Sequence, residues 1–120
     1  MKAYTNLGQS KKLAEFLPLE SADMIYPTDF EYPLLWIKKS KKDYYFIPCW
    51  SLAALLNYLR EIDFFPEIDA NKLEVTMSIT YFNDHEARHL TPVHNITVEA
   101  ESFIDACVEM VLKLHELKLL

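Results

Sequence analysis

The sequence predicts an α+β domain in which helices pack on one face of an antiparallel sheet of about four strands. Three helix-like segments alternate with two pairs of strand-like segments, in the order α-ββ-α-ββ-α. The chain of 120 residues is 51% hydrophobic and 25% charged, which fits one domain over residues 1–120. Gly8 is its single glycine, which excludes glycine-rich phosphate loops and the nucleophile elbow of hydrolases.

The first half of the chain predicts a helix and a hairpin. The helix covers about residues 6–17 and ends at Pro18, since proline disfavours helical backbone in the residue before it. We expect a short helical turn over residues 20–24 to follow. Residues 34–39 and 42–47 are apolar and aromatic runs on either side of a lysine-rich turn, which is the pattern of a β-hairpin.

The second predicted helix begins after Ser51, whose hydroxyl suits the N-cap position. Its apolar residues follow the i, i+3, i+4, i+7 spacing of one buried face. Trp50 precedes the cap and Leu55 lies four residues after it, the arrangement of a hydrophobic staple. Residues 61–71 then form a partly buried connection. The apolar positions of the helix are Leu52, Leu55, Leu56 and Leu59.

Two strands and a wide amphipathic helix are predicted at the end of the chain. Residues 73–81 and 95–100 alternate between apolar and polar side chains, which indicates strands with one buried face. Ser102 and Asp105 form a capping-box-like pair before the last helix, which we expect to lie across that face. Its apolar side comprises Phe103, Ile104, Cys107, Val108, Val111, Leu112 and Leu114, and its polar side Asp105, Glu109, Lys113 and Glu116.

The charge distribution and the short apolar runs make some classes of partner less favoured than others. Residues 1–60 hold 8 basic and 6 acidic residues, whereas residues 61–120 hold 4 and 12. An acidic second half disfavours general nucleic-acid binding, because phosphate contacts dominate that affinity. No apolar run approaches the roughly 18 residues of a membrane span, and the two cysteines form no disulfide framework. We therefore expect a cytoplasmic protein that binds no membrane and no cofactor.

One string matches a metal-binding pattern. His85-Glu86-Ala87-Arg88-His89 fits the zinc-peptidase motif, in which two histidines one helical turn apart bind Zn²⁺ and the glutamate polarises water. That chemistry needs a helix, yet a predicted strand ends just before the string, Asn83-Asp84 is typical of a turn, and Pro92 blocks a continuing helix. A solvated loop is the favoured interpretation, and a zinc-dependent hydrolase is the alternative.

A cluster of lysines beside aromatic residues lies near the tip of the predicted hairpin. This combination binds single-stranded nucleic acid through phosphate contacts and base stacking. Lysines also commonly protect a hairpin tip and a sheet edge from pairing with other chains. Weak nucleic-acid binding is therefore a second alternative. The residues are Trp36, Lys38, Lys39, Lys41, Lys42, Tyr44 and Tyr45.

Two further patterns have a structural and a functional interpretation. Cys49 lies just before the second helix, where the helix dipole favours a thiolate, but no pattern brings a base to it. A structural cysteine is favoured. Glu101, Asp105 and Glu109 follow one another at i, i+4 and i+8 on one helix face. A solvated face is the common explanation for such a line, and a cation site is the alternative.

Three stretches carry a resemblance to a known family. They are Ser21-Ala22-Asp23-Met24, the run from Pro48 to Leu56, and Asp105–Met110 with Leu114-His115-Glu116. In this order they resemble a family of small gut-bacterial proteins that is often associated with phage-like or other mobile elements. No activity is known for that family, so the resemblance implies membership and assigns no catalytic residue.

The favoured function is a non-enzymatic interaction or accessory module that binds a protein partner or a second copy of itself. Residues 26–50 contain 8 of the 16 aromatic residues, and the predicted hairpin is apolar on both faces. Helices in a single-layer α+β domain cover only one face of the sheet. The surplus aromatic surface then packs under the N-terminal segment or forms an interface, where Tyr and Trp are enriched.

Overall fold

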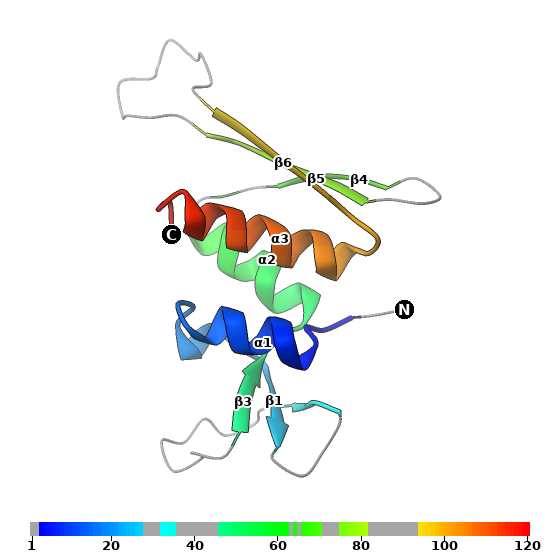
Figure 1. Ribbon diagram of the computed structural model, residues 1–120, viewed down its shortest axis with the longest axis vertical. Helices are drawn as coiled ribbons and strands as arrows, with labels where there is room; N and C mark the ends of the chain where they lie inside the picture. Colours follow the sequence, from blue (N-terminus) through cyan, green and yellow to red (C-terminus); the bar gives the residue numbers. More distant parts are fainter. Residues whose placement is uncertain are drawn as a thin grey trace. The chain divides into compact units, whose positions relative to one another are not determined.

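The computed structural model describes residues 3–27, 32–35, 46–62, 64, 66–70, 75–81 and 94–120 (Figure 1). Within these residues the protein is α+β, with three α-helices and two three-stranded antiparallel sheets. The chain divides into two compact units, Met1–Tyr58 (unit 1) and Leu59–Leu120 (unit 2). Each unit contains one sheet, and the prediction of a single domain stays a prediction.

The predicted single sheet of about four strands is not what the structure shows. The described strands form two separate sheets, and their order is α-βββ-α-βββ-α. The two strands that the sequence patterns missed are β1 (Met24–Pro27) and β4 (Glu67–Ala70). Each has four residues, which is too short for an alternation of apolar and polar side chains to be recognised.

Helix α1 (Leu7–Ala14) opens unit 1 and is shorter than predicted. Asn6 caps it through a reciprocal pair: the Gln9 N–H donates to Asn6 Oδ1 at 2.7 Å, and the Asn6 N–H donates to Gln9 Oε1 at 2.9 Å. After Ala14 the backbone forms a tighter turn, in which the Phe16 N–H donates to the Leu13 carbonyl three residues back.

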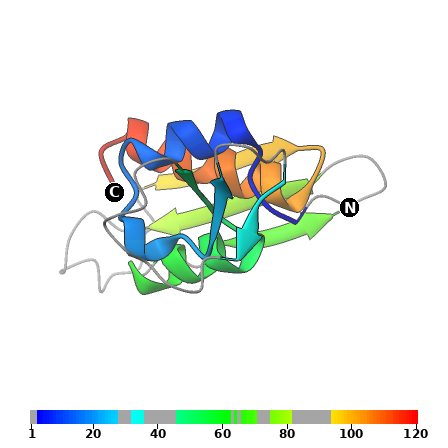
Figure 2. The same ribbon diagram turned by 90° about the horizontal axis from the view of Figure 1, so that it is seen from below.

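The first sheet has the strand order β2-β1-β3, with β2 at Leu34–Leu35 and β3 at Phe46–Cys49 (Figure 2). Met24 of β1 pairs with Leu35 on one side and with Cys49 on the other. The predicted hairpin is therefore wrong where it is described, since β1 separates its two strands. Met24 itself begins a strand, and only the 3₁₀ helix η1 (Leu19–Ser21) represents the predicted helical turn.

Helix α2 (Leu52–Glu61) confirms the predicted second helix and its cap. The Ala54 N–H donates to Ser51 Oγ at 3.1 Å, which satisfies a backbone donor of the first turn. Leu55 and Leu59 are fully buried, as the apolar spacing predicts. Leu52 and Leu56, on the same predicted face, are only half-buried. Trp50, at the staple position before the cap, is fully buried as well.

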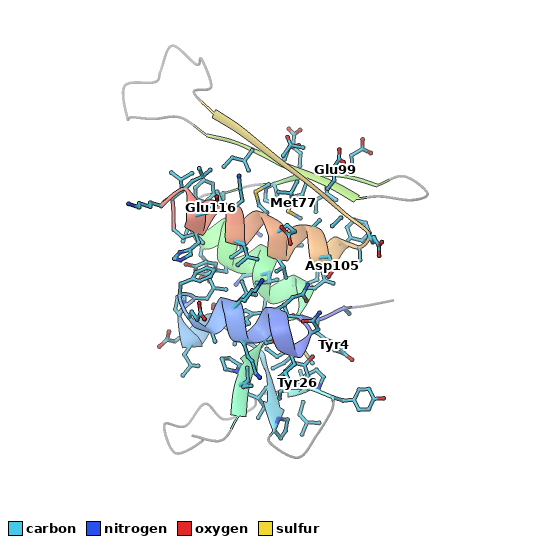
Figure 3. The ribbon with its side chains drawn as sticks, viewed as in Figure 1. Tyr4, Tyr26, Met77, Glu99, Asp105 and Glu116 are labelled. Carbon is cyan, nitrogen blue, oxygen red and sulfur yellow. The ribbon has the colours of Figure 1, made fainter. Side chains whose placement is uncertain are left out.

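Unit 2 contains the second sheet, in the order β4-β5-β6, with β5 at Val75–Tyr81 and β6 at His94–Ala100. Helix α3 (Phe103–Glu116) packs on β5 and β6, as predicted. Figure 3 shows Met77 on the α3 side of the sheet and Glu99 on the opposite side. The alternation along these strands thus separates a buried face from an outer face.

The buried face of α3 is rotated slightly from the predicted one. Phe103 is exposed and Leu112 is half-buried, whereas Ala106 and Met110 are fully buried. The polar side is confirmed for Glu109, Lys113 and Glu116, which are exposed, while Asp105 is half-buried beside the cap. The buried residues are Ile104, Ala106, Cys107, Val108, Met110, Val111 and Leu114.

A Schellman motif ends α3. The Leu119 N–H donates to the Leu114 carbonyl at 2.9 Å, and the Lys118 N–H donates to the His115 carbonyl at 3.0 Å. Lys118 has a φ of 61°, in the left-handed region that favours glycine. The chain therefore places a lysine at a position where most helices of this type have glycine.

Lys118→Gly is expected to stabilise the protein by about 0.5 kcal/mol. Glycine relieves the strain of the left-handed backbone, which is worth roughly 1–2 kcal/mol. This gain exceeds the cost of the greater conformational entropy of the unfolded chain, about 0.4–1 kcal/mol. Chemical denaturation measures the change. Lys113→Gly, within the same helix, is the control and should lose about 1 kcal/mol. A loss of stability in Lys118→Gly would contradict this account of the helix end.

Candidate functional site

A cluster of hydrogen bonds joins two of the stretches that carry the family resemblance, the one that begins at Ser21 and the one that begins at Pro48. The Trp50 indole Nε1–H donates to Ser21 Oγ at 2.9 Å. The Asp23 carboxylate accepts from the Ser51 N–H at 2.9 Å and from the Ser51 hydroxyl at 2.5 Å. The segment Ser21-Ala22-Asp23 is thereby fixed against Cys49-Trp50-Ser51 within unit 1.

Asp23 also orients the cap of α2. The Ser51 hydroxyl donates its proton to the carboxylate, which leaves the Ser51 oxygen free to accept the Ala54 N–H. A carboxylate beside a helix N-terminus further interacts favourably with the helix dipole. Stabilisation of α2 therefore explains why these two positions are an aspartate and a serine, and a ligand is not needed to explain them.

Thr5 connects the N-terminal segment to the same cluster. Its N–H donates to the Trp50 carbonyl at 2.9 Å, and the Trp50 N–H donates to Thr5 Oγ1 at 3.1 Å. Thr5 Oγ1 lies 2.7 Å from Ser10 Oγ, and the Tyr26 hydroxyl donates to the Thr5 carbonyl at 2.7 Å. Thr5 and Ser10 are fully buried, so these bonds satisfy polar groups that water cannot reach.

Cys49 lies within this cluster as a thiol. It is fully buried, and its Sγ donates to the Thr5 carbonyl at 3.4 Å. Burial raises the pKa of the Cys49 thiol, the opposite of the shift that a nucleophilic thiolate requires. Burial also raises the pKa of Cys107 to about 12. Both cysteines therefore fit the structural interpretation.

Both thiols are expected to be protected from reagents in the folded protein. At pH 8 an aromatic disulfide should modify Cys49 and Cys107 at least about 100-fold more slowly in the native protein than in the unfolded chain, because reaction requires an opening. Peptide mapping by mass spectrometry assigns the modified residue. Native labelling of Cys49 at the unfolded rate would revive the nucleophile hypothesis.

A second candidate site is a set of exposed apolar side chains at the edge of the first sheet, on both faces of β2 and at Tyr32 just before it. Tyr32 and Leu35 are each 70% exposed, and Leu34 is 49% exposed. Leu34 and Leu35 are successive residues of β2, so their side chains point to opposite faces of the sheet. Among the described strands, β2 lies at the edge of its sheet. We call Tyr32, Leu34 and Leu35 the β2 surface.

The remaining predicted site residues fall into two groups. Glu101 precedes the Ser102 cap and so lies outside α3, which corrects the predicted line on one helix face. Glu101 and Glu109 are exposed, whereas Asp105 accepts a hydrogen bond from the Ser102 hydroxyl at 2.8 Å. No three metal-binding side chains gather in the described part of the chain. The other candidates lie outside the described residues: His85, Glu86, His89, Trp36, Lys38, Lys39, Lys41, Lys42, Tyr44 and Tyr45.

The comparisons with known proteins add no relative. No protein-family model, no curated protein and no solved structure matches this chain. The resemblance to gut-bacterial proteins therefore stays an expectation. In the described segments, no helix combines the length and apolar character needed to cross a membrane.

Sequence reasoning missed most of the buried cluster. Thr5 and Cys49 are separated by 44 residues, and neither lies in a pattern that indicates their contact. Tyr26 and Trp50 belong to the aromatic-rich stretch, but only the structure shows that their polar atoms bind inside unit 1. Tyr32 belongs to the same stretch but is exposed. The aromatic content alone does not distinguish a buried aromatic residue from an exposed one.

Proposed function

We propose that the protein is a non-enzymatic interaction module that associates with a second copy of itself through the β2 surface. The observation that carries this proposal is the exposure of three large apolar side chains within four consecutive residues, Tyr32 to Leu35. Apolar surface of this kind is stabilised when it leaves water. Tyrosine is also enriched in interfaces between proteins.

Among its described residues, the aromatic-rich stretch at residues 26–50 contains both buried and exposed aromatic side chains. Tyr26 and Trp50 are buried, and their polar atoms bond to Thr5 and Ser21 within unit 1. Tyr32, in contrast, is exposed beside Leu34 and Leu35. The internal packing of unit 1 thus leaves part of the stretch available for contact with another molecule.

The charge distribution favours self-association through unit 1. Residues 1–58 hold 7 basic and 6 acidic residues, a net charge of +1, whereas residues 59–120 hold 5 and 12, a net charge of −7. Two copies that met through unit 2 would bring like charges together, at a cost that salt only partly screens. Contact through the nearly neutral unit reduces this repulsion.

An edge strand also suits a symmetric contact. Edge strands present backbone groups that pair with another chain, although the two residues of β2 permit only a short pairing. An antiparallel pair of identical strands is related by a two-fold axis. The β2 surface is small, so we expect a weak, concentration-dependent dimer in place of a permanent one.

Leu35→Lys is expected to weaken self-association at least about tenfold, the effect of losing about 1.4 kcal/mol of binding free energy. Sedimentation velocity and light scattering over a range of protein concentrations measure the dissociation constant. Leu19→Lys is the matched control, since Leu19 is 46% exposed in unit 1 but lies outside the β2 surface. This control should associate like the unmodified protein.

Two results would overturn the proposal. A protein that stays monomeric at every accessible concentration would remove self-association. Equal weakening by Leu35→Lys and Leu19→Lys would show that general surface polarity, and not the β2 surface, controls the contact. Circular dichroism of each variant confirms that the fold is retained before the association constants are compared.

A further inference from the structure

We draw no further inference here: the strongest candidate, the outer face of the β4-β5-β6 sheet with the exposed carboxylates of Glu67, Asp69 and Glu99, is an acidic surface for which nothing in the described residues identifies a ligand.

Discussion

Trp50→Ala is expected to lower the free energy of unfolding by about 3–5 kcal/mol, a large part of the stability of a small protein. Trp50 is fully buried, and its indole N–H donates to Ser21 Oγ. Alanine would leave a cavity and remove this link to the segment that orients the α2 cap. Chemical denaturation followed by far-ultraviolet circular dichroism measures the loss.

Tyr32→Ala is the matched aromatic control. Tyr32 is 70% exposed, so its truncation should change the free energy of unfolding by less than about 0.5 kcal/mol. Where Trp50→Ala does not fold, Trp50→Phe retains most of the ring and removes the N–H, at an expected cost of about 1–2 kcal/mol. A Trp50→Ala variant as stable as Tyr32→Ala would contradict the central role of this side chain.

The elements that the sequence predicted well are those with long periodic patterns. Helices α2 and α3 each repeat their apolar positions over several turns and begin after a serine cap, Ser51 or Ser102. Strands β5 and β6 alternate over seven residues each. In these segments the local pattern predicts the type of element, although the buried face of α3 is rotated slightly from the predicted one.

The sheet organisation was not predictable in the same way. Met24 pairs with both Leu35 and Cys49, and no local pattern in a four-residue strand indicates either partner. Two apolar runs separated by a polar turn are typical of a hairpin, but β1 lies between β2 and β3. Long-range pairing of the short strand β1 therefore separates the described strands β2 and β3, which no local pattern indicates.

The two candidate sites show the same contrast between local sequence patterns and long-range contacts. Both faces of the run at Leu34 and Leu35 are apolar in sequence, and both side chains are exposed in the structure. The buried cluster depends instead on contacts between distant segments, such as the Thr5 side chain with the Trp50 backbone. Single polar residues such as Thr5 carry no pattern, so their burial emerges only from the fold.

Leu114→Ala in α3 is expected to cost about 2–5 kcal/mol, and Val108→Ala or Val111→Ala about 1–3 kcal/mol each. Leu114 is fully buried, and its carbonyl accepts the Leu119 N–H of the helix end. Truncation removes buried apolar contacts and leaves a cavity that the closely packed interior closes only in part.

Glu109→Ala on the exposed side of the same helix is the control for these truncations. Glu109 lies between the buried positions Val108 and Met110 in sequence but is exposed, so its loss should cost less than about 0.5 kcal/mol. Denaturant titration of all variants under one condition compares the two faces directly. If Glu109→Ala were as damaging as Leu114→Ala, the carboxylate would have to make a contact of its own, and the surroundings of Asp105 and Glu109 on α3 would become the first place to search for a bound cation.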